Sequence, residues 1–312
     1  MSWNIKDFIL EVVNEEQLNE KLMVYNNRKP YGQVVFLAGG AGSGKGFASN
    51  HFLDKEMFKV RDVDKMKKQL QILNRLGKID IDGILKKYGK NIPAKEIENI
   101  RSIQSQGFQL RNLQLKQPNH VRALHQLVKA MGIKDSSLEK LLVGKDNPET
   151  LPNIMFDITA KDVSDITKVV PMLKKAGYQS KNVHLTWVLT NFVTAMENNK
   201  QRERMVPEDI LLKTHEGAAN TVWGLITKAM PKGLNGRVDV ILNNPKHTVL
   251  YTDPTGATDE EGKPVKVKGI AKGFLSLPVK KEGGSILPEK VWKEKLFNWV
   301  KNNAPDSITQ YM

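Results

Sequence analysis

A lysine preceded by closely spaced glycines is the part of the chain best suited to chemistry. Five of the eight residues from Gly39 to Gly46 are glycine, and Lys45 follows four of them. Glycines let successive backbone N–H groups point into one concavity that can surround a polyphosphate. A lysine at this spacing reaches the β- and γ-phosphates. The pattern predicts a phosphate-binding loop for a nucleotide, formed by Gly39, Gly40, Ala41, Gly42, Ser43, Gly44, Lys45, Gly46 and Phe47.

One position departs from this motif. The residue after the lysine is usually Ser or Thr, whose hydroxyl holds Mg²⁺, whereas this chain has Gly46 followed by Phe47. We therefore expect Mg²⁺ to be positioned mainly by phosphates, water and a carboxylate. The alternative is a glycine-rich turn between a strand and a helix that binds no ligand.

Carboxylates follow two other strand-like runs. Asp62 and Asp64 come directly after residues 58–61, and Asp157 ends residues 153–157. In a kinase, a carboxylate at this edge takes the proton of the acceptor hydroxyl, and another orients the water around Mg²⁺. We expect Asp157 and Asp62 to serve the metal. The alternatives are a helix N-cap for Asp62 or Asp64, and a strand-end turn for Asp157.

Arginines on a connection between two predicted helices could assist the same chemistry. Arg202 and Arg204 precede Pro207. By spacing alone, Lys200 could contact a triphosphate as well as Arg202 could. Arginines on a mobile connection can close on a triphosphate and stabilise the transferring phosphoryl group. The alternative is an exposed basic loop without a catalytic role.

Alternating strands and helices would position these residues. The predicted strands are 34–38, 58–61, 153–157, 183–189 and 237–242, and helices are predicted for 45–53, 65–76, 162–176, 191–199 and 207–230. This alternation predicts a three-layer α/β fold of the P-loop NTPase type, with a mainly parallel five-stranded sheet. Ligands of such sheets bind beyond the carboxyl ends of the strands, where the glycine-rich loop lies.

The remaining segments divide the chain further. We expect an N-terminal amphipathic helix within 1–30, a kinase-like core from 31–76 and 150–245, a basic helical insertion from 77–149, and a C-terminal part from 246–312. The insertion is predicted to contain helices at about 94–115 and 121–131. The C-terminal part is expected to be hairpin-rich and to end in an amphipathic helix from Pro288.

Charge and composition restrict the partners. The formal net charge is +14, and thirteen Lys or Arg against four acids from Lys65 to Arg122 account for +9 of it. Such a stretch favours a nucleic acid or another polyanion, although a solvated helix face would look the same. There are no cysteines, no secretory signal and no apolar run of membrane-spanning length, so we expect a cytoplasmic protein without a membrane partner.

Taken in order, these motifs resemble the P-loop kinases of the zeta-toxin group, which are similar to small-molecule and polynucleotide kinases. The resemblance covers about residues 33–76 and 150–245. It is carried by Gly39–Gly46, Val60–Lys67, Ile154–Thr159, Lys174–Tyr178 and Arg204–Leu211.

The resemblance implies an ATP- and Mg²⁺-dependent kinase that phosphorylates a hydroxyl. It implies that Asp64 is the base, Lys45 the phosphate-binding lysine and Arg204 a lid arginine, and that Asp157 stands where the family has an acid. The family phosphorylates nucleotide sugars and other hydroxyl compounds, and related viral enzymes phosphorylate hydroxymethylated bases in DNA. Gly46 and the helical insertion depart from the family pattern.

Three functions remain open on this basis. The basic insertion favours a kinase acting on a nucleic-acid-linked hydroxyl, such as a modified base or a strand end. A kinase of a nucleotide sugar or another small molecule is the second. The third is a nucleotide-binding scaffold or virion protein with weak catalysis, which the missing hydroxyls at positions 46 and 47 favour. Ile5–Glu11 also resembles short leaders of tailed-phage head proteins, and the alternative there is an ordinary docking helix.

Overall fold

The computed structural model describes residues 31–53, 55–133, 138–139, 142, 147–202, 205–243, 248–252, 258, 266–270 and 275–303. The expected N-terminal helix and the leader-like Ile5–Glu11 lie outside these residues. In the described part, no helix combines the length and apolar composition needed to span a membrane.

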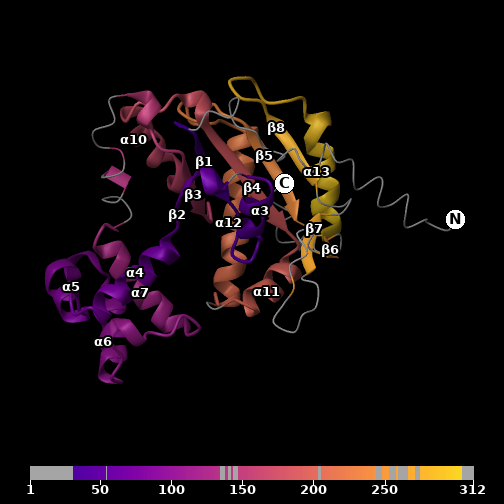
Figure 1. The fold of residues 1–312 in the computed structure, drawn as a ribbon. Helices are drawn as coiled ribbons and strands as arrows, with labels where there is room; N and C mark the ends of the chain where they lie inside the picture. The colour runs from indigo at the N-terminus through magenta and orange to yellow at the C-terminus, as the bar shows by residue number, and fades with distance from the viewer. Residues whose placement is uncertain are drawn as a thin grey trace.

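A six-stranded sheet forms the centre of the fold (Figure 1). Its strands run in the order β2-β3-β1-β4-β5-β8, and the first five are parallel. Their bounds are β1 Val34–Ala38, β2 Lys59–Arg61, β3 Ile154–Ile158, β4 Val183–Thr190, β5 Val238–Asn243 and β8 Leu275–Lys280. The predicted α/β fold is thus confirmed.

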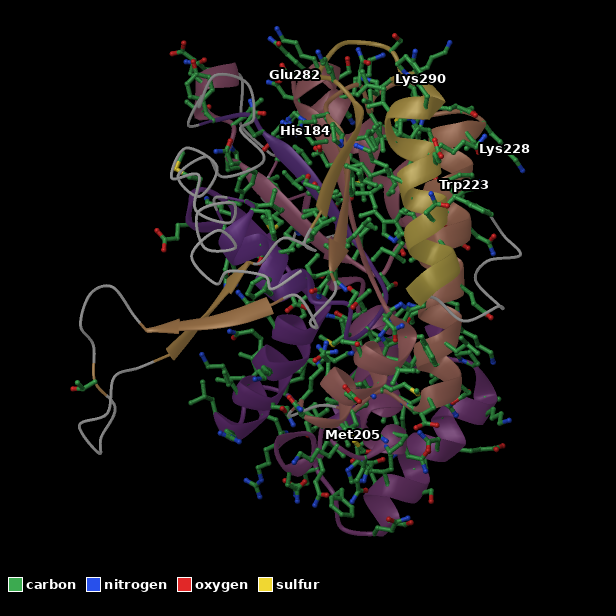
Figure 2. All side chains as sticks on the ribbon, turned by 90° about the vertical axis from the view of Figure 1, so that its right-hand side faces the viewer. His184, Met205, Trp223, Lys228, Glu282 and Lys290 are labelled. Carbon is green, nitrogen blue, oxygen red and sulfur yellow. The ribbon has the colours of Figure 1, made fainter. Side chains whose placement is uncertain are left out.

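The predicted count of five strands is wrong by one. The sixth strand, β8, pairs antiparallel with β5 at the sheet edge. This strand was not predicted as part of the sheet, because its segment was expected to form hairpins. An antiparallel edge strand needs no crossover helix, so the alternation of strands and helices gives no signal for it. A hairpin does exist, since β6 (Thr248–Thr252) and β7 (Lys266–Ile270) form a separate antiparallel pair that projects from the body of the molecule in Figure 2.

Apolar side chains on both faces of the sheet produce three layers. Val34 and Phe36 of β1 contribute to the larger core, where helices α9 (Ser164–Thr167), α10 (Val169–Lys175), α12 (Glu208–Thr227) and α13 (Glu289–Asn303) bury their apolar faces. Val35 and Leu37 face α3 (Lys45–His51) on the other side. Because β1 is buried on both faces, it reads as a continuous apolar run.

The helix predicted over 162–176 is divided between α9 and α10. Pro171 explains the division: it lacks an N–H, and its ring would clash with the carbonyl of Thr167, four residues earlier. The second piece ends before Gly177, which has a φ of 95° and so suits a helix C-terminus. Helix α11 (Phe192–Lys200) begins after Asn191, whose side chain accepts hydrogen bonds from the N–H groups of Val193 and Thr194.

Residues 63–133 form what we call the helical lobe. It contains α4 (Val63–Arg75), α5 (Ile81–Tyr88), α6 (Ala94–Ser105) and α7 (Pro118–Ala130), and it has an apolar core of its own. The lobe lies to one side of the sheet in Figure 1. Short 3-10 turns occur at Lys55–Met57, Gly89–Asn91, Leu110–Asn112, Pro148–Thr150 and Ser180–Asn182.

The helix expected to reach about residue 115 ends ten residues earlier, at Ser105. Gly107 adopts a φ of 83°, and the N–H of Phe108 donates to the carbonyl of Ile103 at 3.3 Å. These are features of a left-handed glycine cap, which stops a helix however favourable the following residues are.

Candidate active site

The glycine-rich loop leaves the sheet at its topological switch point. β1 has β3 on one side and β4 on the other, and the chain passes from Ala38 through the loop into α3. Parallel α/β sheets bind ligands beyond the carboxyl ends of the strands at such a point. The predicted strand, loop and helix are therefore all present and in order.

Several loop positions admit only glycine. Gly42 and Gly44 have φ values of 75° and 90°, which side-chain-bearing residues adopt with difficulty. A Cβ at Gly42 would collide with the carbonyl of Ala195, and one at Gly44 would collide with the side chain of Asn243. The glycines thus let the loop bend and let neighbouring elements approach its backbone.

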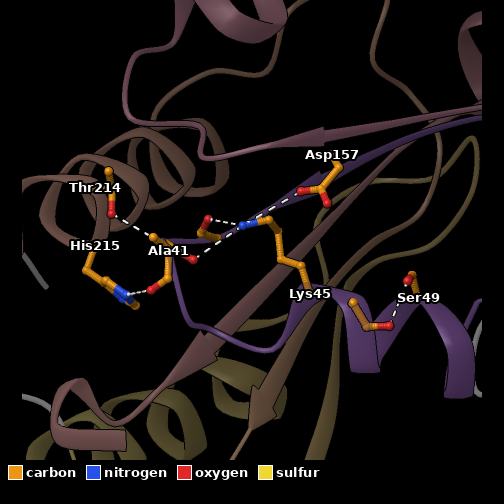
Figure 3. Close-up of polar contacts among 9 residues, drawn as sticks. Ala41, Lys45, Ser49, Asp157, Thr214 and His215 are labelled. Carbon is orange, nitrogen blue, oxygen red and sulfur yellow. Dashed lines mark hydrogen bonds and ion pairs between the residues drawn. The ribbon is translucent and has the colours of Figure 1, made fainter. Parts of the chain in front are cut away.

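Helix α12 holds the middle of the loop (Figure 3). His215 Nε2 donates to the carbonyl of Ala41 at 2.8 Å, and Thr214 Oγ1 accepts the N–H of Ala41 at 3.2 Å. A Cβ at Gly40 would meet the ring of His215. The backbone of the loop is therefore packed directly against a buried imidazole.

This imidazole is uncharged at neutral pH. Burial, with a smaller effect of Lys45, lowers the pKa of His215 to about 4. Because a carbonyl can only accept, Nε2 carries the proton in the neutral ring. Phe192 packs edge-on against the same ring, with centroids 5.7 Å apart. His215 therefore supports the loop without adding a charge beside Lys45.

Two asparagines hold the rest of the loop. Asn198 Nδ2 of α11 donates to the carbonyl of Gly42 at 3.0 Å. Asn243 Nδ2, at the end of β5, donates to the carbonyl of Ser43 at 2.8 Å, and its own carbonyl accepts from Thr190 Oγ1. Sequence analysis missed these supports. Only Asn243 carried a signal, because it is a polar residue directly after the predicted strand 237–242.

Lys45 and Asp157 lie close together. Lys45 Nζ donates to the carbonyls of Gly39 at 2.6 Å and Gly40 at 3.3 Å, and it lies 3.7 Å from Asp157 Oδ1 (Figure 3). Its side chain is only 13% exposed. The ammonium group is thus placed inside the curve of the loop, next to the strand-end carboxylate.

The hydroxyl of Ser43 marks the same place as polar. The Ser43 side chain is buried, and in the described part of the chain its Oγ has no hydrogen-bond partner. A buried hydroxyl without a partner is costly unless a ligand or water satisfies it. The glycine backbone, Lys45 and Ser43 therefore fit a polyphosphate.

The structure describes the two predicted carboxylates after β2 only in part. Asp62 follows β2 directly and is half-buried. Asp64 is the second residue of α4, and its side chain lies outside the described part. Asp62 and Asp64 do not lie on one continuing strand, because β2 ends at Arg61 and α4 begins at Val63.

The arginine-bearing connection is closed by one buried side chain. Asn199 Nδ2 donates to the carbonyl of Val206 at 2.7 Å, and Asn199 Oδ1 accepts the N–H of Val206 at 3.0 Å. These two bonds close the segment that carries Arg202, whose side chain is exposed. Arg204 lies outside the described residues, so its role stays a prediction.

The metal expectation depends on few protein ligands. Among the described residues, no three His, Asp or Glu side chains gather as a metal site would require. Mg²⁺ bound with a nucleotide needs only one or two carboxylates, because phosphates and water supply its other ligands. Asp157 fits that role by its position, and Gly46 contributes no side-chain ligand.

The space around Gly46 leads to a prediction. A Cβ at Gly46 would meet no described atom within 4 Å. The φ angle of Gly46 is also not positive, so a residue with a side chain can adopt its backbone conformation. We expect Gly46→Ser to fold normally and to lower the Mg²⁺ concentration that half-saturates ATP-dependent activity about threefold or more, since a hydroxyl at this position ligates the metal. Magnesium titration at fixed ATP measures this, with Gly46→Ala as the matched control. An equal shift in both variants would contradict the metal role of the hydroxyl.

Comparisons with known proteins add fold-level similarities only. The chain matches no protein-family model and no curated protein. It is similar to a solved complex of AvrRxo1-ORF1 and AvrRxo1-ORF2 with sulphate ions (12% identity, TM-score 0.40, 89% of this chain and 75% of that one). The same complex with ATP is similar over 99% of this chain and 85% of that one, again with 12% identity and a TM-score of 0.40.

A structure from the PezAT toxin–antitoxin system of Streptococcus pneumoniae is also similar. Its identity is 14% and its TM-score 0.37, over 77% of this chain and 78% of that one. Similarities at this level carry no inference about activity. The assignment of the site therefore rests on its own geometry.

Proposed function

We propose that this protein is an ATP-dependent phosphotransferase that phosphorylates a hydroxyl. The observation that carries the proposal is the Lys45 ammonium, held inside a glycine loop at the switch point of a parallel sheet, 3.7 Å from Asp157. This combination provides a cation for the phosphates and a carboxylate for the metal in one place.

The residues divide the work as follows. A polyphosphate offers Lys45 charged acceptors in place of the carbonyls of Gly39 and Gly40, and Ser43 Oγ gains a partner. Asp157 and Asp62 would hold Mg²⁺ through water, and the ion would neutralise negative charge on the phosphates. Asp64, at the start of α4, takes the proton of the acceptor hydroxyl, and Arg202 and Arg204 stabilise the phosphoryl group in transfer.

A nucleic-acid-linked hydroxyl is the acceptor class that we favour. The Lys and Arg side chains of the helical lobe are exposed except for Lys67, and the stretch from Lys65 to Arg122 carries a net charge of +9. A nucleotide sugar or another small acceptor does not need such a surface. Phosphate contacts would also make turnover strongly dependent on salt.

A nucleotide-binding scaffold with weak catalysis is the second candidate. The observation that favours it is Gly46, which has no hydroxyl for Mg²⁺. The two candidates agree on nucleotide binding and differ on transfer.

Transfer of the γ-phosphate of labelled ATP separates them. The acceptors to compare are single-stranded DNA, RNA, hydroxymethylated DNA and nucleotide sugars. We expect labelled polynucleotide, with a steep loss of activity between low and moderate salt. Label on nucleotide sugars alone would overturn the nucleic-acid acceptor, and ATP binding without transfer to any acceptor would favour the scaffold.

A further inference from the structure

The helical lobe contains a cavity apart from the phosphate loop. It has a volume of about 940 Å³ and lies where the ends of α4, α5 and α6 meet the segment around Phe108. We call it the lobe cavity. Its size is at the upper end of the range for small-ligand sites, so it can hold more than one aromatic group.

The net charge of the side chains that line the lobe cavity is positive. Lys78, Lys87 and Arg111 line it and are exposed. Two acids also line it, so the net charge of the lining is +1, and both acids already have partners. Asp80 Oδ1 accepts the N–H of Gly83 at 2.6 Å as a helix cap, and Asp82 pairs with Arg101, which lowers the pKa of its carboxyl. The cavity therefore favours an anionic ligand.

Aromatic rings lie among these cations. Tyr88 and Phe108 both line the lobe cavity and are half-buried. Lys87 Nζ lies 5.2 Å from the centre of the Tyr88 ring. Phe108 packs edge-on against His120, with ring centres 4.5 Å apart, which orients it. A flat ring beside a cation suits a base joined to a phosphate.

The backbone around the cavity is held in place before any ligand binds. Asn74 Nδ2 donates to the carbonyl of Ile79 at 2.6 Å, and Asn74 Oδ1 accepts the N–H of Arg111 at 3.0 Å. This one side chain ties the end of α4 to the segment that carries Arg111. A preformed site loses less conformational entropy on binding than a flexible one.

We propose that the lobe cavity binds single-stranded nucleic acid, with phosphates on Lys78, Lys87 and Arg111 and a base on Tyr88. A concave site can take up the exposed bases of a single strand, whereas the bases of a duplex are stacked within the double helix. The role of this site, to hold the acceptor strand while its hydroxyl reaches the phosphate loop, rests on the proposed function. The binding itself does not.

Binding of a fluorescent 12-nucleotide DNA strand, measured by anisotropy without ATP or Mg²⁺, tests the proposal. We expect the triple variant Lys78→Gln, Lys87→Gln, Arg111→Gln to weaken binding about 30-fold or more. The slope of the logarithm of the binding constant against the logarithm of salt concentration should become shallower by about two. The matched control is Lys174→Gln, Lys175→Gln, Lys228→Gln, which removes three exposed lysines outside the lobe. We expect the control to stay within about threefold of the parent protein.

The aromatic contact has its own pair of variants. Tyr88→Leu should weaken binding about fivefold or more, whereas Tyr88→Phe keeps the ring and should bind as the parent does. Thermal unfolding confirms that each variant is folded. Equal losses in the two triple variants, equal effects of the two Tyr88 variants, or tighter binding of a duplex than of a single strand would each overturn the proposal.

The two proposals fail separately. Lys45→Ala should bind the strand like the parent protein, because Lys45 lies outside the lobe. A parent protein that binds ATP and transfers its phosphate but does not bind the strand would overturn only the lobe cavity. A parent protein that binds the strand but neither binds ATP nor transfers its phosphate would overturn only the proposed kinase.

Discussion

Lys45→Ala is expected to lower kcat/KM for phosphoryl transfer from ATP about 10²–10³-fold. The ammonium group of Lys45 is the cation held inside the loop, and removing one aligned charged donor from a developing phosphoryl charge has an effect of this size. ATP affinity should also fall, because the same group contacts the phosphates in the ground state. Transfer assays and calorimetric titration with ATP measure the two effects.

Lys174→Ala is the matched control, because Lys174 is exposed on α10 and away from the loop. It should leave both quantities unchanged. Thermal unfolding should show that Lys45→Ala is folded, since the contacts of Lys45 in Figure 3 are with carbonyls of its own loop and with Asp157. If Lys45→Ala bound and used ATP like the parent protein, the phosphate-loop assignment would be wrong.

Asp64→Asn is expected to lower kcat about 10²–10⁴-fold, the range for loss of a general base. The amide is close to the carboxylate in size but cannot accept the proton of the acceptor hydroxyl. The KM for ATP should change little, because the base acts on the acceptor. Steady-state kinetics with each substrate varied in turn measure this difference between kcat and KM.

Asp62→Asn and Asp209→Asn serve as comparisons. Asp62 is the neighbouring carboxylate and is proposed to act through Mg²⁺, so excess metal should partly restore its variant. Asp209 is exposed in the first turn of α12, and its variant should be fully active. A loss in Asp62→Asn that exceeds the loss in Asp64→Asn would move the role of base to Asp62.

Much of the fold could be predicted because its signals are local. β1 has the predicted bounds, since a buried parallel strand is a continuous apolar run between turn residues. A helix with Pro207 in its first turn was also predicted, because proline suits the beginning of a helix, and α12 begins one residue later, at Glu208. The errors occurred where local signals conflict with backbone geometry. A left-handed Gly107 ended α6 early, Pro171 divided α9 from α10, and the antiparallel β8 carried no crossover helix.

The candidate site was likewise predicted only in part from the sequence. The sequence alone identified the loop, Lys45 and the strand-end Asp157, because glycine spacing and strand ends are read along the chain. It did not identify His215, which holds Ala41 from 174 residues away, or Asn243, which holds Ser43 from 200 residues away. Contacts over such separations arise when α12 packs on the sheet and β5 pairs with β4, and only the tertiary structure decides which side chains then meet the loop. The lobe cavity has the same origin, since α4, α5 and α6 surround it only after they share a core.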